Sequence, residues 1–342
     1  MSTKGPSAIE PGKRILVTGA NGYIGSHVVD LLLSLNYLVR GTIRTDRPWL
    51  NQFFESKYGP GRFETVTIPK LDDQEALLEA LRDVSGIIHV ASDVSMAPNA
   101  SEIIPYAVSL TETILTVAAK ASVSRVVFTS SSAAAYMTQP GVEGIVVTKD
   151  TWNDAAVKAA WDRNTPAEFQ GFMAYMASKT ESERAAWRWI ERNKPKFAFN
   201  TVLPNFTLGR ILHPHIAGST MKWTSELLEG NDSIMKLVPP QHYVDVGDVA
   251  RIHVIALLES TVQSERLFAM AYPFTWNAVV NILRELRPFS KGLVPPPTNE
   301  LEDLSNVLPL KRAKALLKSF FGQSDWTGLS DSLEAGITSL GL

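Results

Sequence analysis

A glycine-rich loop near the amino terminus limits the folds open to this chain more than any other feature. It spans residues 19–25, places Gly19, Gly22 and Gly25 three positions apart, and joins a β-branched run, 13–19, to a helical pattern. Glycines at this spacing permit a tight turn and let the backbone approach a pyrophosphate, which the amino terminus of the helix attracts. A glycine-rich turn without a ligand is the alternative, but the flanking strand and helix patterns favour a dinucleotide site.

The rest of the first two hundred residues alternates between strand and helix patterns. Short apolar runs predict strands at residues 38–43, 63–68, 86–91, 125–131 and 197–203. Helices are predicted after Asp72 and Asp73, whose carboxylates suit a first helical turn, and over residues 103–121 and 175–190. Strands that alternate with helices in this way form βαβ units, so we predict an α/β fold with a doubly wound parallel sheet.

The alternation of strand and helix patterns ends after residue 132. Beyond residue 204 the predicted elements become shorter and richer in proline and glycine. We therefore predict a dinucleotide-binding domain over residues 1–204, to which 243–269 returns. Residues 205–242 and 270–342 then form a smaller, C-terminal substrate-binding lobe. Residues 140–172 show weak periodicity, and we expect the long segment between Ser131 and Tyr175 to form part of the wall of the pocket.

Composition excludes several classes of protein. The 342 residues carry a net charge of −2, which gives no electrostatic footprint for nucleic acid or an anionic membrane. Cysteine is absent, so disulfides, thiolate nucleophiles and cysteine-based metal sites are excluded. Residues 1–13 are polar and lack the apolar core of a signal peptide, so we expect a cytoplasmic protein that acts on a small molecule.

The end of the second predicted strand bears on which dinucleotide is bound. A site for NAD places an acid there to meet the ribose 2′-hydroxyl, whereas a site for NADP offers a cation to the 2′-phosphate. The strand contains no acid and is followed by Arg44 and Arg47, with Asp46 between them. Asp46 is the candidate for NAD, although it could equally pair with the two arginines. Arg44 offers planar, bidentate donors to a phosphate, which favours NADP.

A second motif, Tyr175-x-x-x-Lys179, points to acid–base chemistry. On a helix these two residues share a face, and a nearby ammonium favours the phenolate and lowers the tyrosine pKa. Alone the pair is common, and an interfacial tyrosine beside a solvated lysine is the alternative. A run of hydroxyls, 129–131, ends the fifth predicted strand, at the edge where parallel sheets bind ligands. A hydroxyl there can reach a substrate carbonyl.

At this point the chain resembles the extended short-chain dehydrogenase/reductase (SDR) family. The resemblance is closest to the fungal aldehyde reductase II-type, NADPH-dependent carbonyl reductases, which are related to dihydroflavonol and cinnamoyl-CoA reductases. It rests on motifs that run in family order over most of the first 260 residues: the glycine loop, Val39 to Arg44, His89 to Ser92, Phe128 to Ser131, Tyr175-x-x-x-Lys179, Val202 to Asn205 and Tyr243 to Ala250. A Rossmann fold of the extended SDR type is what this resemblance implies.

The resemblance also implies a role for each matching residue. Tyr175 would give a proton to the carbonyl oxygen while NADPH delivers hydride, Lys179 would lower the tyrosine pKa and hold the nicotinamide ribose, and Ser131 would hydrogen-bond the substrate. Ser130 and Ser132 are the alternatives to Ser131 if the register differs by one. The implied cofactor contacts are Gly19, Asn21, Gly22, Tyr23, Ile24, Gly25, Arg44, Leu71, Ala91, Ser92, Tyr175, Lys179 and Pro204.

Two positions refine this expectation. Many family members have an acid before the residue matching Leu71, where this chain has Lys70, so an adenine contact there would come from the backbone. Family dehydratases commonly place acids after the fifth-strand threonine, where this chain has Ser130 and Ser131, which argues against dehydration.

Gln241 and His242 lie where the resemblance places pocket wall, so both are candidate substrate contacts. His213 and His215 lie in a loop with no third ligand at a suitable spacing, and we expect no metal. The predicted function is NADPH-dependent reduction of an aldehyde or ketone to a chiral alcohol, by a monomer or homodimer. An NAD-dependent nucleotide-sugar epimerase and a non-enzymatic, NADP-sensing regulatory protein are the alternatives.

Overall fold

A computed structural model describes residues 7–342; the first six residues of the predicted 1–204 domain lie outside the described residues. Its core is a seven-stranded parallel sheet in the order β10-β7-β5-β4-β1-β2-β3. The strands are β1 (Arg14–Thr18), β2 (Leu38–Ile43), β3 (Phe63–Thr67), β4 (Val84–His89), β5 (Arg125–Thr129), β7 (Ala198–Pro204) and β10 (Arg266–Ala269). The predicted α/β, doubly wound fold is confirmed.

Helices cover both faces of this sheet. The helices of the large sheet are α1 (Tyr23–Ser34), α2 (Pro48–Tyr58), α3 (Gln74–Ala80), α4 (Ala100–Lys120), α5 (Asp154–Trp161), α6 (Ala167–Asn193) and α9 (Val246–Leu258). Alternation along the strands sends Ile15, Val17 and Val127 into one apolar cluster with α1 and α9. The intervening Leu16, Val126 and Phe128 enter a second cluster with α3, α4 and α6. Buried, continuously apolar strands are what a doubly covered parallel sheet requires.

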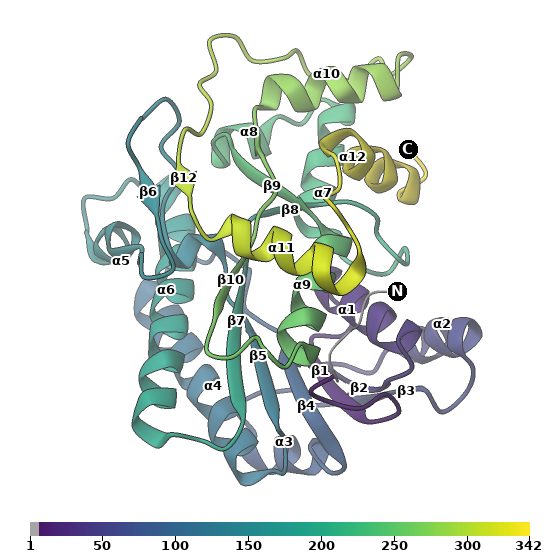
Figure 1. Ribbon diagram of the computed structural model, residues 1–342. Coiled ribbons are helices and arrows are strands. Elements are labelled where there is room, and N and C mark those ends of the chain that lie inside the picture. Colours follow the sequence, from purple (N-terminus) through teal and green to yellow (C-terminus); the bar gives the residue numbers. More distant parts are fainter. Residues whose placement is uncertain (1–6) are drawn as a thin grey trace.

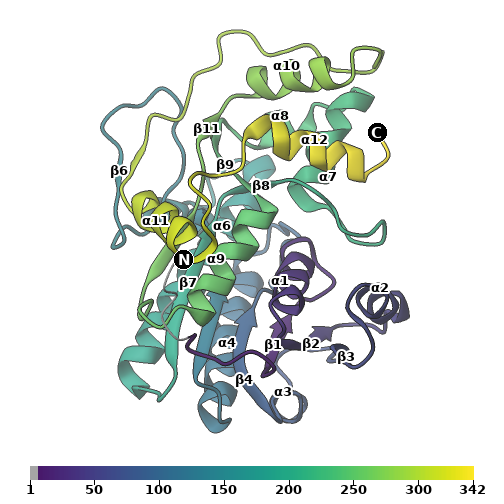
Figure 2. The same cartoon turned by 45° about the vertical axis from the view of Figure 1, so that its right-hand side comes forward.

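The chain then builds a smaller sheet beside the large one. It contains β8 (Phe206–Leu208), β9 (Gln241–Asp245) and β11 (Pro273–Phe274), in the order β11-β9-β8. Figures 1 and 2 show it on one side of the parallel sheet, together with α7 (Ser219–Ser225), α8 (Ser233–Leu237), α10 (Trp276–Leu286) and α12 (Leu329–Ser339). A two-stranded ribbon, β6 (Val146–Val147) with β12 (Asn306–Val307), and α11 (Leu310–Phe321) complete the fold.

Several boundaries differ from those expected. The segment 140–172 holds β6, α5 and the start of α6, which begins at Ala167 rather than at Tyr175. Helix α2 follows β2 and was not predicted. The whole of β9 lies in the smaller sheet, and α11 packs against α9 and β10 of the large sheet. The division into two lobes stays a proposal, with residues 243–245 of β9 and helix α11 on the opposite side from the one expected.

Helix α4 is long and apolar enough to cross a membrane by length and composition alone, and it is the one such helix within residues 7–342. Buried core helices of globular proteins pass the same test, and 44% of its most apolar window is buried. The helix packs against α6 and α3 beside the parallel sheet, which accounts for its apolar character.

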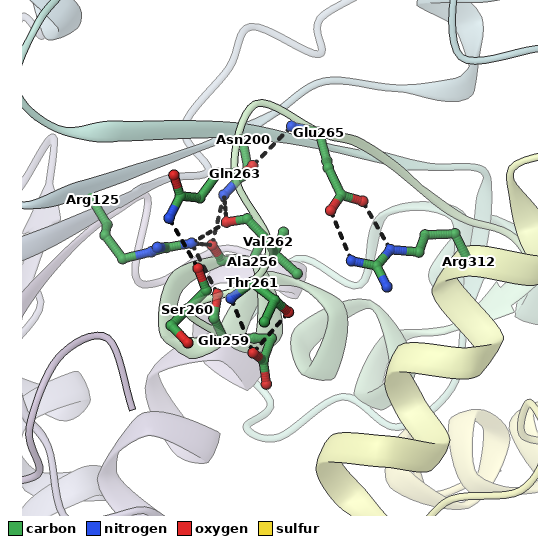
Figure 3. A network of polar contacts seen from close by, with 10 residues as sticks. All are labelled: Arg125, Asn200, Ala256, Glu259, Ser260, Thr261, Val262, Gln263, Glu265 and Arg312. Atoms are coloured by element: carbon green, nitrogen blue, oxygen red, sulfur yellow. Dashed lines mark hydrogen bonds and ion pairs between the residues drawn. The ribbon is translucent and has the colours of Figure 1, made fainter. Parts of the chain in front are cut away.

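Two polar side chains at the amino ends of β5 and β7 hold the turn that leads from α9 to β10 (Figure 3). The Arg125 guanidinium donates to the carbonyls of Ala256, Glu259 and Val262. The Asn200 amide donates to Ala256 and Val262 at 2.9 and 3.1 Å and accepts from the Glu265 N–H at 2.9 Å. Carbonyls at the end of a helix have no partner within the helix, so these side chains satisfy them.

We predict that Asn200→Ala lowers the free energy of unfolding by about 2–3 kcal/mol, because the fully buried Asn200 side chain leaves a small cavity and the partly buried Glu265 N–H loses its acceptor. The exposed Gln263 of the same turn donates only to Ser260, so Gln263→Ala should cost less than about 0.5 kcal/mol. Urea unfolding followed by circular dichroism measures both. Equal losses in the two variants would contradict the role given to Asn200.

Candidate active site

The glycine loop between β1 and α1 is shaped by close backbone contacts. Gly19 has a φ of 67°, and a Cβ there would lie 3.1 Å from the Cα of Ala91. A Cβ on Gly25 would lie 2.1 Å from the carbonyl oxygen of Gly19, so α1 could not pack so close to the loop with any larger residue. No side chain caps α1 at Gly22, which leaves the first N–H groups of the helix free to meet an anion. The loop therefore fits the pyrophosphate of a dinucleotide.

A cleft of about 550 Å³ runs from this loop along the carboxyl ends of β1, β2 and β4. Five predicted cofactor residues line it: Gly19, Arg44, Leu71, Ala91 and Ser92. The Arg44 side chain is exposed at this cleft. Within residues 7–342, Asp46 makes no ion pair with Arg44 or Arg47, so the pairing considered for Asp46 is not found.

The other predicted cofactor residues are not among those that line this cleft. Asn21 and Ile24 are half-buried in the loop and the first turn of α1. The Tyr23 phenol turns away from the cleft and donates to the Gly209 carbonyl at 2.7 Å, so Tyr23 can offer a ligand only its backbone N–H. Pro204 is buried at the end of β7.

Tyr175 and Lys179 lie one turn apart on α6, facing the carboxyl end of β5. The buried Lys179 ammonium approaches the Thr129 carbonyl at 3.5 Å. Burial lowers the pKa of Lys179 to about 8, against the opposing effect of the Glu183 carboxylate. Burial raises the pKa of the Tyr175 phenol, and a hydrogen bond with Ser131 opposes that rise. Tyr175 is thus a protonated phenol beside a hydroxyl and near a cation.

The structure separates the three candidate serines. Ser130 donates its hydroxyl to the Glu183 carboxylate at 2.7 Å, behind the site, and is buried. Ser132 is buried in the short 3-10 helix, Ser132–Ala134, that follows β5. Ser131 and Ser132 both line a second cleft together with Tyr175, and of these two serines Ser131 is the one that hydrogen-bonds the Tyr175 phenol. Of the three, Ser131 is the hydroxyl placed to act together with Tyr175.

The carboxylate of Glu183 is a feature that the sequence analysis missed. Glu183 is fully buried and accepts from Ser130, Thr201 and Arg266 at 2.7–3.0 Å. Its position was readable in part, because Tyr175, Lys179 and Glu183 follow one another at steps of four along one helix. Arg266, on β10, lies too far along the chain for any spacing rule to connect it with Glu183.

A second cleft, of about 140 Å³, opens between Tyr175 and the smaller sheet. Val94 lines both clefts, so the two adjoin. Apolar lining residues include Met96, Met137, Phe172, Phe206, Trp223 and Val238. None of the described residues that line it carries a charge. Its character suits a neutral, apolar small molecule.

Ser131 and Gln241, two of the three predicted substrate contacts, line this second cleft, and the third, His242, does not. Because successive side chains of a strand point to opposite faces, His242 of β9 turns away from Gln241. Its buried imidazole bonds the Asp303 carboxylate, with Nδ1 and Oδ2 3.0 Å apart. The expectation that His242 touches substrate is therefore dropped, and the one for Gln241 is kept.

His213 and His215 pack with an aromatic side chain of α2. The His213 ring stacks on Trp49 with their centroids 4.3 Å apart, and His215 lies 5.6 Å from the same ring. No group of three or more side chains suited to hold a metal ion occurs in the part of the chain that the structure describes.

Comparisons with known proteins place the chain among enzymes. Residues 15–270 match the model of the NAD dependent epimerase/dehydratase family. Ketoreductase adrE of Penicillium rubens is 43% identical over 333 residues, which cover 96% of this chain and 97% of the relative. Aldehyde reductase 2 of Sporidiobolus salmonicolor is 36% identical and covers 96% of each chain. The structure of the yeast methylglyoxal/isovaleraldehyde reductase Gre2 complexed with NADPH superposes with a TM-score of 0.80 at 25% identity, over 96% of this chain and 98% of Gre2.

The chain belongs to the NAD dependent epimerase/dehydratase family. It is an oxidoreductase with the extended SDR fold, as the resemblance implied. The glycine loop borders the first cleft, and residues that follow β4 and β5 line the first and the second cleft respectively.

We predict that Lys179→Met raises the free energy of unfolding at pH 7 by about 1–3 kcal/mol. Lys179 is charged in both states at pH 7 and loses hydration on folding. Between pH 8 and 10.5 the folded wild type has released this proton and the unfolded chain still binds it, so wild-type stability rises with pH and the advantage of the variant shrinks.

Urea unfolding of both proteins at pH 7 and pH 9.5 tests this expectation. The exposed Lys158 of α5 provides the control, because Lys158→Met should change stability by less than about 0.5 kcal/mol at either pH. A variant less stable than the wild type at pH 7 would show that the Lys179 ammonium is not under the burial penalty described.

Proposed function

We propose that this protein is an NADPH-dependent carbonyl reductase that converts an aldehyde or ketone to a chiral alcohol. The observation that carries the proposal is the placement of Ser131 and Tyr175 in an uncharged cleft that adjoins the dinucleotide cleft. The ketoreductase and aldehyde reductase relatives support it, and so does the likeness to the NADPH complex of Gre2. A nucleotide-sugar substrate would bring a diphosphate, for which the second cleft offers no cation.

Each catalytic side chain has a task that its surroundings favour. The cofactor supplies the hydride when bound. The Tyr175 hydroxyl gives its proton to the carbonyl oxygen, and the Ser131 hydroxyl donates a hydrogen bond to the same oxygen. The resulting tyrosinate is stabilised by the buried Lys179 ammonium, whose attraction is weakly screened at this depth. Attack on one face of a carbonyl held against these groups gives a single enantiomer.

Selectivity for NADPH rests on Arg44. Its guanidinium lies at the end of β2, lines the cofactor cleft, and has no carboxylate partner among residues 7–342. A free guanidinium at this position can bind a 2′-phosphate in a bidentate manner. Leu71 lines the same cleft, where its backbone would contact the adenine ring.

The uncharged second cleft and the near-neutral net charge of the chain bear on the partners that we propose. A small neutral carbonyl compound is the partner that the second cleft favours, with neither nucleic acid nor a membrane surface involved. We propose a cytoplasmic enzyme that acts as a monomer or a homodimer.

We predict that Tyr175→Phe reduces kcat by at least about 100-fold, because the proton donor is lost, and leaves the dissociation constant for NADPH within about twofold. Oxidation of NADPH, followed at 340 nm with aryl ketones, keto esters and aldehydes, measures turnover. NADPH fluorescence measures binding. Retained turnover would remove Tyr175 from the mechanism.

We predict that Arg44→Ala raises KM for NADPH by about 10- to 100-fold and changes KM for NADH by less than about threefold. A charge-assisted, bidentate contact to the 2′-phosphate exists only with NADPH. Arg47→Ala, beside it but not lining the cleft, serves as the matched control. Equal effects of Arg44→Ala on both cofactors would assign Arg44 a purely structural role, and purification with tightly bound NAD would favour the epimerase alternative.

A further inference from the structure

Among the described residues that line the second cleft, Asn205 carries a buried side-chain donor to which the protein itself gives no acceptor. The amide nitrogen of Asn205, Nδ2, is buried and has no hydrogen-bond partner within the described residues. Asn205 follows β7 directly and lines the cleft together with Ser131 and Tyr175. Buried amide nitrogens are almost always paired in folded proteins, so a free one at a ligand cleft calls for an acceptor from outside the chain.

The orientation of this amide is set by its neighbour. Oδ1 of Asn205 accepts the Phe206 N–H at 2.7 Å, a bond that the amide nitrogen could not replace, because both groups would be donors. The backbone is also fixed, since the Asn205 N–H donates to Ala269 at 3.3 Å and the Asn205 carbonyl accepts from Thr207 at 3.0 Å. Nδ2 therefore cannot rotate toward a partner in the protein without the loss of an existing bond.

The other amide of the cleft differs in this respect. Gln241 already donates to the Pro239 carbonyl, at 3.4 Å. No lining residue supplies a carboxylate that could pair with Asn205, and the absence of charge argues against an ionic ligand group. The acceptor that fits Nδ2 is thus a neutral oxygen.

We propose that Asn205 is a specificity-determining residue, whose Nδ2 donates a hydrogen bond to a second, neutral carbonyl or ester oxygen of the substrate. The inference rests on the proposed carbonyl reductase function and narrows its substrate class to bifunctional compounds, such as keto esters and diketones. A cleft built to hydrogen-bond a substrate group discriminates strongly against analogues without it, because the buried donor is then left unpaired.

The carboxamide of a bound nicotinamide offers the same acceptor chemistry, so the experiment separates the two sources. Asn205→Asp keeps the oxygen that accepts from Phe206 and replaces the free donor with an acceptor, and Asn205→Ala removes both. The substrates are ethyl benzoylacetate and butyrophenone, which share an aryl ketone and differ in the ester group. The exposed Asn193→Asp, at the end of α6, is the control variant.

We expect both Asn205 variants to lower kcat/KM for ethyl benzoylacetate by about 10- to 100-fold and for butyrophenone by less than about threefold. The dissociation constant for NADPH, measured by fluorescence, should stay within twofold, which also reports that the variants are folded. Asn193→Asp should resemble the wild type in all three measurements.

Equal losses with the two substrates would overturn the proposal, and so would weaker NADPH binding, which would assign the donor to the nicotinamide carboxamide. Wild-type enzyme that reduces both substrates with equal kcat/KM would also overturn it while leaving the reductase function intact. No reduction of any carbonyl compound by folded wild-type protein would instead reject the reductase function itself.

Discussion

The arrangement of the active site depends on one buried carboxylate. Glu183 lies on α6 one turn beyond Lys179 and receives hydrogen bonds from Ser130 after β5, Thr201 on β7 and Arg266 on β10. The Arg266 guanidinium also donates to the Lys149 and Thr151 carbonyls and lies 4.0 Å from the ring of Trp152.

A buried ion pair contributes little net stability, because desolvation offsets its attraction, but it permits only one alignment of the elements it joins. In this protein the Glu183–Arg266 pair fixes both the position of α6 along the strands and its distance from the sheet. Because Ser130 is turned toward Glu183, the next residue, Ser131, faces the opposite way, toward Tyr175. The depth of Lys179 follows from the same contact, and so does the nearby negative charge that keeps its pKa from falling further than about 8.

Two histidines complete the polar layer at the carboxyl edge of the sheet. The Thr18 hydroxyl oxygen accepts the N–H groups of Val90 and Ala91, so its proton is donated to Nδ1 of His89, 2.7 Å away. On the other side of the sheet, His253 donates Nδ1–H to Val249 and accepts the Thr129 hydroxyl at Nε2. Burial lowers the pKa of His89 to about 3 and that of His253 to about 4, so both stay neutral. Within this layer Lys179 is the buried side chain that carries a positive charge, which suits a group that stabilises a tyrosinate.

The parts of this design that could be predicted from sequence are those set by local spacing. The glycine loop, the Tyr175–Lys179 pair and the alternation of strands and helices each depend on neighbours within about ten residues. The orientation of His242 would also have been predictable if 241–245 had been taken as a strand, since alternation then separates it from Gln241. Arg266, by contrast, meets Glu183 only because β10 becomes the edge strand beside β7, a pairing between distant segments. Choosing Ser131 over Ser130 likewise required contacts between distant segments, namely those of Ser130 with Glu183 and of Ser131 with Tyr175.

The same distinction explains how the two clefts differ. The loop at one end of the cofactor cleft is shaped by backbone contacts, because its glycines leave no room for a Cβ and the end of α1 is free, so a short motif specifies that end of the cleft. The second cleft is formed by side chains from separate segments, among them 94–96, 131–138, 172–176, 205–206, 219–223 and 238–241. No spacing rule connects these segments, and each can change without disturbing the sheet. A chain with this fold can therefore keep its dinucleotide site while its substrate changes. The Nδ2 donor of Asn205 is a polar group in the second cleft that no hydrogen bond among the described residues uses.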